Sequence, residues 1–155
     1  MVQSNRKRQA TAAVELAVCM PFLLIIIFGV WEVGRMVQAQ QIITNAVREG
    51  GRQAAAGRSN ATTVRQTVVN YLVMNGLKDV TLDNVTLTNL TDSGRTDPST
   101  AEQLDHFRVT VNVPYASIRW STLAQITSVS TLTASADWYS MRDVPIVVSA
   151  TIPAN

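Results

Sequence analysis

The stretch from Leu16 to Trp31, LAVCMPFLLIIIFGVW, decides how this chain is built, because it holds no charged residue. With Thr11 to Glu15 it makes about 20 residues, enough to span the ~30 Å hydrocarbon core of a bilayer at ~1.5 Å per residue. Its aliphatic and phenylalanine side chains favour insertion by very roughly 3 to 7 kcal/mol, which exceeds the ~3 kcal/mol cost of Glu15. We therefore predict a transmembrane helix over 11–31, kinked near Pro21.

Basic residues on either side of this span predict its orientation. Arg6, Lys7 and Arg8 precede the span, whereas Arg35 and Arg48 follow it. This bias favours a cytoplasmic N-terminus, with residues 1–10 as a basic leader.

A cleaved signal peptide is the competing interpretation, with a cut after the small-residue pattern Val37-Gln38-Ala39. It is disfavoured because the apolar run exceeds the usual 7–15 residues. Glu32 and Arg35 also lie between that run and the cut.

Length and composition limit the remaining possibilities. The 155 residues leave room for one domain after the span, and we assign it to residues 32–155. A net charge of +2 without a stripe of Lys and Arg argues against a nucleic-acid partner. The single cysteine, Cys19, and the single histidine, His106, cannot build a metal cluster or a disulfide within the chain. We find no catalytic set of residues and expect no cofactor and no enzymatic activity.

The apolar helix is predicted to continue beyond the span. Apolar residues recur near a 3.6 period at Val33, Val37, Ile42, Ile43, Ala46 and Val47. Gly50-Gly51 is expected to weaken the helix, and Gly57 to end it, after about 40 residues in all. A second helix is predicted to begin at a cap on Asn60 or on Thr63, the latter as a capping box with Gln66. It is expected to end at Asn75-Gly76.

Alternating apolar residues then predict strands. The clearest alternations run over Phe107 to Tyr115, ended or placed at an edge by Pro114, and over Leu132 to Trp138. A third alternation over Val80 to Leu87 slips in phase at Asp83-Asn84, where a bulge or tight turn is expected. The segment Asp92 to Glu102 is predicted to be a loop, and Ile118 to Ile126 is ambiguous. The tail from Val144 to Ile152 fits an edge strand or disorder. These patterns predict an α+β fold with an antiparallel sheet of three to four strands.

Residues of the N-terminal third resemble the TadE-like family, the minor pseudopilins of tight-adherence (Flp) type IV pilus systems. The resemblance consists of small residues before Val-Glu, a proline, an aliphatic run with Phe-Gly, Glu-x-Gly-Arg, and a helical Thr-Asn-Ala-x-Arg-Glu-Gly-x-Arg stretch. The matching positions are Val14, Glu15, Pro21, Phe28, Gly29, Glu32, Gly34, Arg35, Thr44, Asn45, Ala46, Arg48, Glu49, Gly50 and Arg52. The segment Leu132 to Arg142 is a weaker match to the final strand of such proteins.

The resemblance implies a single-pass protein of the bacterial inner membrane with a periplasmic pilin-like domain. Its partners would be other pilin or pseudopilin subunits, assembly platform proteins and membrane lipid, and it would serve as a non-catalytic component of a pilus or secretion machine. A prepilin peptidase would cut between Ala10 and Thr11, although Ala10 stands where the family usually has glycine. The alternative is a signal-anchored extracytoplasmic binding module.

Several residues are candidates for subunit assembly. Glu15 lies one helical turn from Thr11, so its carboxylate can meet the amine that cleavage would expose there or on a neighbouring subunit, and thereby set the register of packing. The alternative is a carboxylate that extends to the lipid headgroups beside Arg8. Glu32 and Arg35 are three residues apart and can pair on one helix face. Pro21, Arg48 and Glu49 complete the set of assembly candidates.

Overall fold

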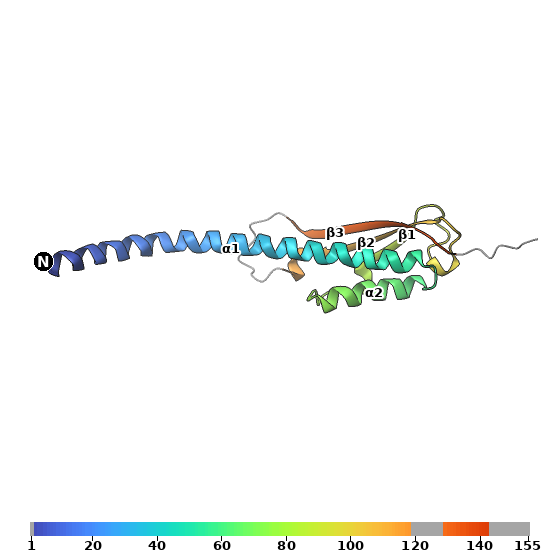
Figure 1. Cartoon of the computed structure of the whole chain (residues 1–155), viewed down its shortest axis with the longest axis horizontal. Coiled ribbons are helices and arrows are strands. Elements are labelled where there is room, and N and C mark those ends of the chain that lie inside the picture. Colours follow the sequence, from blue (N-terminus) through green and yellow to red (C-terminus); the bar gives the residue numbers. More distant parts are fainter. Residues whose placement is uncertain (1, 119–128, 143–155) are drawn as a thin grey trace, which may run out of the picture.

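A computed structural model describes residues 2–118 and 129–142 of the chain. Its longer elements are α1 (Val2–Ala55), α2 (Ala61–Met74), β1 (Val85–Asn89), β2 (His106–Pro114) and β3 (Thr131–Tyr139). Figure 1 shows α1 as a long rod whose N-terminal half projects away from the other elements. Its C-terminal half lies with α2 over the sheet (Figure 1). This is the α+β architecture that the sequence predicted.

Helix α1 is longer than the sequence predicted. It runs for 54 residues because it includes the basic leader back to Val2, and it continues through Pro21 and through Gly50-Gly51. The predicted kink at Pro21 stays a prediction. The predicted end is confirmed: α1 stops at Ala55, and Gly57 adopts a left-handed φ of 62° that suits glycine.

Helix α2 begins at the first of its two predicted caps. The Asn60 Oδ1 accepts a hydrogen bond from the backbone N–H of Thr63 at 2.8 Å. The alternative cap at Thr63 with Gln66 is wrong, because the Asn60 cap already places Thr63 within the first turn. The helix ends at Met74, as predicted, and Gly76 takes a φ of 93° while the N–H of Leu77 donates to the carbonyl of Leu72. This six-to-one hydrogen bond closes the last turn.

The sheet has the order β1-β2-β3, and both neighbouring pairs are antiparallel. The two clearest alternations are confirmed as β2 and β3, and β2 ends at Pro114 as expected. The first strand starts later than predicted, because Leu82–Asn84 forms a 3₁₀ turn. In that turn Asn84 Oδ1 accepts from the N–H of Thr81 at 2.8 Å, and this is the tight turn expected at Asp83-Asn84. The segment 119–126 and the predicted tail strand lie outside the described residues.

The core lies between the sheet and the two helices. Alternate residues of β2 point into it, and Ile43, Val47 and Leu72 of the helices meet them with no exposed surface. The buried residues of β2 are Phe107, Val109, Val111 and Val113. Each buried aliphatic side chain stabilises the fold by about 1.5–3 kcal/mol relative to an exposed one. The C-terminal half of α1 is therefore part of the domain.

Two glycines of α1 allow the layers to approach closely. A Cβ on Gly51 would lie 1.6 Å from Nε1 of Trp138 on β3, and one on Gly50 would lie 2.4 Å from Cγ2 of Val68 on α2. Any side chain at these positions would force the helix away from its neighbours. The two glycines that were expected to weaken α1 instead let α2 and β3 pack against it.

Candidate functional site: the exposed helix and its junction with the domain

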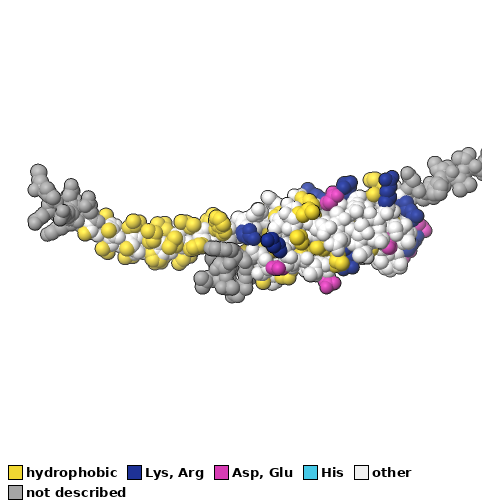
Figure 2. Space-filling model, turned by 90° about the horizontal axis from the view of Figure 1, so that it is seen from below, with side chains coloured by type: hydrophobic (Ala, Val, Ile, Leu, Met, Phe, Trp, Pro, Cys, Tyr) yellow, Lys and Arg dark blue, Asp and Glu magenta, His cyan; other side chains and the backbone are white. Residues whose placement is uncertain are grey.

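The N-terminal half of α1 carries apolar side chains on every side, and the described residues leave them exposed. Figure 2 shows these side chains covering the projecting helix. The exposed large apolar residues of this half are Val14, Leu16, Val18, Met20, Phe22, Leu23, Leu24, Ile25, Ile26, Ile27, Phe28, Val30 and Trp31. By length and composition this helix can cross a membrane, and none of its most apolar window is buried. A helix that is apolar all round requires surroundings other than water, either lipid or other helices.

The predicted assembly residues of this half lie on the same exposed surface. Ala10, Thr11, Glu15 and Pro21 are all exposed on α1, which runs without a break through the bond between Ala10 and Thr11. Glu15 is the one charged side chain between Thr11 and Trp31. Its side chain is exposed on the part of α1 that projects from the domain, so a second molecule can reach it.

The junction between the two halves of α1 is built around Glu32. Its side chain is only 3% exposed, and the hydroxyl of Tyr115 donates to Glu32 Oε1 at 2.5 Å. Tyr115 begins the 3₁₀ turn η3 (Tyr115–Ser117), which follows β2. A buried carboxylate that lost this donor would be costly, so the bond holds α1 against the end of β2.

Arg35, one turn further along α1, binds the same region. Its Nε donates to the carbonyl oxygen of Ile118 at 3.1 Å. Among the described residues, no ion pair joins Glu32 to Arg35, because each side chain reaches the segment after β2 instead. Sequence reasoning missed Tyr115 as a partner of Glu32, because the alternation that ends at Pro114 carries no information about a contact 83 positions away.

The charged residues further along α1 lie on its outer face. Arg48 is exposed, and Arg52 makes a two-bond contact with Glu49 through Nε at 3.0 Å and Nη2 at 2.5 Å. The hydrogen bond from Arg52 lowers the pKa of Glu49 below its ordinary value. These side chains leave a charged helix face turned away from the sheet.

The polar face of the sheet holds a further cluster of titratable groups. Arg108 binds Asp137 through Nε at 2.7 Å and Nη2 at 2.6 Å, and His106 Nε2 lies 3.4 Å from the same carboxylate. The His106 ring stacks on Tyr139 with a centroid separation of 4.6 Å. Within residues 2–118 and 129–142 no group of His, Cys, Asp and Glu is suited to hold a metal ion.

The fold and the exposed helix together define a small α+β domain carried on one long helix that is apolar enough to cross a membrane. Within that class, residues 10–52 match the model of a family described as TadE-like protein. This match confirms the resemblance seen in the sequence and links the chain to Tad pilus-associated proteins. It covers the exposed half of α1, the junction and most of the packed half. No match was found among curated proteins or among solved structures.

Proposed function

We propose that the chain is a non-catalytic minor pilin or pseudopilin subunit of a tight-adherence pilus assembly or secretion machine. The observation that carries this proposal is the exposed apolar half of α1, which continues without a break into a packed domain. The TadE-like match over residues 10–52 of this helix supports the same role. Such a helix can sit in lipid before assembly and among the helices of other subunits afterwards.

In this proposal residues 1–10 are a cytoplasmic leader, residues 11–31 cross the bacterial inner membrane, and residues 32–155 form a pilin-like domain in the periplasm. The basic leader favours this orientation. The boundary at residue 32 is supported by burial, since Glu32 is the first buried side chain along the described part of α1. The partners would be other pilin or pseudopilin subunits and the assembly platform.

The assembly contacts are assigned to charged positions along α1. Glu15 would meet a positive group of an incoming subunit in the apolar layer, where a single acid sets the register strongly. The amine of Thr11 is that group if a prepilin peptidase cuts after Ala10. Arg48 and Glu49 would contact neighbouring subunits outside the membrane, whereas Pro21 would shape the helix within it.

Cleavage of the helix as a signal peptide fits the packing less well than its retention as an anchor does. A cut after Ala39 would remove Glu32 and Arg35 from their bonds to Tyr115 and Ile118. It would also expose the end of α1 beside Ile43, a residue of the core. The domain would lose its junction and would leave the Tyr115 hydroxyl without Glu32.

The test uses two measurements on protein purified from membranes: the mass of the mature chain, which gives its N-terminus, and the proteins that co-purify with it. Intact mass should show either the whole chain or a chain that starts at Thr11, and a chain that starts at Gln40 would contradict the anchor. Glu15→Ala should reduce co-purification with pilus components, whereas the matched control Asp79→Ala, at an exposed position of the domain, should not. Equal co-purification of both variants would remove the role of Glu15. Recovery of a soluble ligand without pilus partners would favour a signal-anchored binding module.

A further inference from the structure

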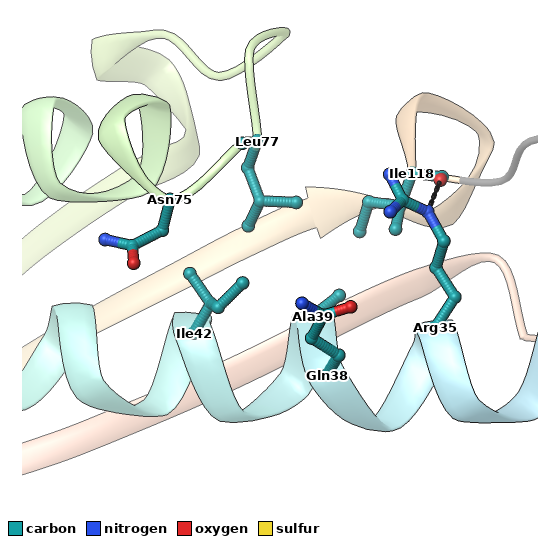
Figure 3. Close-up of a pocket in the computed structure, with 8 residues that line it drawn as sticks. Arg35, Gln38, Ala39, Ile42, Asn75, Leu77 and Ile118 are labelled. Carbon is teal, nitrogen blue, oxygen red and sulfur yellow. Dashed lines mark hydrogen bonds between the residues drawn. The ribbon is translucent and has the colours of Figure 1, made fainter.

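A small groove lies where α1 leaves the junction. It has a volume of about 50 Å³ and is lined mainly by Arg35, Gln38, Ile42, Asn75, Leu77 and Ile118. Figure 3 shows Arg35 at one end of the groove and Asn75 beside Ile42 at the other. Polar and apolar side chains thus line the groove together, with Arg35 and Asn75 at its two ends. Such a groove accepts a small polar group that is attached to an apolar body.

The groove offers hydrogen-bond donors and a positive charge. Arg35 is exposed, its Nε donates to the carbonyl of Ile118, and its guanidinium group lines the Ile118 end of the groove (Figure 3). Asn75 Nδ2 donates to the carbonyl of Tyr71, so its Oδ1 is the atom offered to a ligand. The neighbouring acid, Glu32, is buried and bound by Tyr115, and no described acidic residue lines the groove. A guanidinium in these surroundings favours an anion, above all a phosphate.

The height of the groove along α1 indicates the source of that phosphate. Arg35 follows Trp31 by one helical turn, which places it about 6 Å beyond the end of the apolar run at ~1.5 Å per residue. The headgroup layer on each side of the hydrocarbon core is roughly 5–8 Å deep. Trp31, which is 65% exposed, is of the residue type that gathers at this boundary. In the proposed membrane anchor, Arg35 therefore stands at the level of the lipid phosphates.

We propose that this groove binds the phosphodiester headgroup of a membrane phospholipid, with Arg35 on the phosphate and Gln38, the next polar residue of the lining, on the polar end of the headgroup. The inference rests on the proposed membrane anchoring. A lipid held there fixes the height and the rotation of the domain on the bilayer, because Arg35 is tied to η3 by the same side chain.

The test is native mass spectrometry of the full chain in detergent micelles with phosphatidylglycerol, compared with a diacylglycerol that has the same acyl chains and no phosphate. Wild type should bind phosphatidylglycerol about tenfold more tightly than Arg35→Gln does. A tenfold loss of affinity is expected when one charge-assisted hydrogen bond is removed. Diacylglycerol should bind both proteins equally. Equal retention of phosphatidylglycerol by both proteins would overturn the proposal.

A second variant avoids the Arg35 bond to Ile118, whose loss alone could disturb η3. Gln38→Glu places a carboxylate in the groove and should repel the phosphate, whereas Gln41→Glu adds the same charge at an exposed position of α1 outside it. Equal lipid retention by these two variants would contradict the site.

Full competition by inorganic phosphate would assign the groove to free phosphate and overturn the lipid assignment. Flotation with vesicles separates the two proposals. If the wild type does not float, the anchor itself is wrong; if it floats but its mass spectra show no preference for phosphatidylglycerol over diacylglycerol, only this inference is wrong.

Discussion

The two halves of α1 share one continuous helix and have opposite surroundings. In the N-terminal half every large apolar residue is exposed, from Val14 at 64% to Trp31 at 65%. In the C-terminal half Ile43, Ala46 and Val47 have no exposed surface, and charged residues occupy the outer face. The first half is apolar all round, whereas the second is apolar along one stripe. The pattern around the helix, rather than helix propensity, separates a segment that needs lipid from one that needs a domain.

The largest effect is expected from charging the exposed half. Ile25→Arg with Ile26→Arg replaces two exposed apolar side chains and should make insertion about 6 to 8 kcal/mol less favourable. Carbonate extraction of membranes should then release the protein. The control is Gln41→Arg with Asn45→Arg, which charges the outer face of the packed half and should leave the protein in the pellet. Retention of the first variant would show that α1 is not held by lipid.

Truncation of one isoleucine in each half sharpens the comparison. Ile43→Ala opens a cavity in the core and should lower the free energy of unfolding of the domain by about 2–5 kcal/mol. Ile27→Ala, at a side chain that is 59% exposed, should leave it unchanged. Urea unfolding in detergent micelles, followed by tryptophan fluorescence, measures both. Similar losses in the two variants would mean that the halves unfold as one packed unit.

Glycine substitutions provide a third comparison of the halves. Gly51→Ala places its methyl group on the Trp138 ring and should destabilise the domain by about 3 kcal/mol. Gly29→Ala, in the exposed half, has no atom within 4 Å of the new methyl and should be neutral or slightly stabilising, because alanine favours the helix. Thermal unfolding of the two variants gives the difference. A stable Gly51→Ala protein would argue against the close approach of α1 and β3.

The junction is expected to show a smaller effect. Tyr115→Phe removes the donor to Glu32 and leaves a buried carboxylate oxygen unsatisfied, which should cost about 1–2 kcal/mol. Tyr139→Phe, at an exposed ring, serves as the control and should cost less than about 0.5 kcal/mol. Hydrogen exchange should also speed up near Glu32 in the first variant alone. Unchanged exchange there would mean that the two halves of α1 are not joined through this bond.

The smallest effect concerns the charged outer face. The hydrogen bond from Arg52 lowers the pKa of Glu49 in the folded protein below its value of about 4.3 in the unfolded chain. The pair therefore contributes its full stabilisation above pH ~4.3, and this stabilisation is lost as the pH falls through the lower pKa of the folded protein. The urea midpoint of Glu49→Gln should lie slightly below that of wild type near neutral pH, and the difference should vanish in acid. The effect is small because Arg52 is largely exposed and Glu49 is partly exposed, so solvent screens the pair. A difference that grew in acid would contradict this sign.

Local chemistry accounts for the parts of the fold that the sequence predicted. The apolar run, the Asn60 cap, the glycines at 57 and 76 and the alternation of β2 and β3 each depend on residues within a few positions of one another. The start of β1 was misplaced because Val80 is buried like a strand residue, while Asn84 bonds back to Thr81 and closes a 3₁₀ turn. The pattern of apolar residues alone does not distinguish a strand from a 3₁₀ turn that follows a buried residue.

The sequence by itself determined that the first half of α1 is an apolar rod with one acid, because composition and length suffice for that conclusion. Only the tertiary structure decided that Glu32 binds Tyr115 and that Arg35 binds the backbone at Ile118, since each pair is separated by 83 positions in the chain. The same holds for Gly50 and Gly51, whose role depends on side chains of α2 and β3. Contacts between distant segments are set by how the layers pack, and periodicity along one segment carries no information about them.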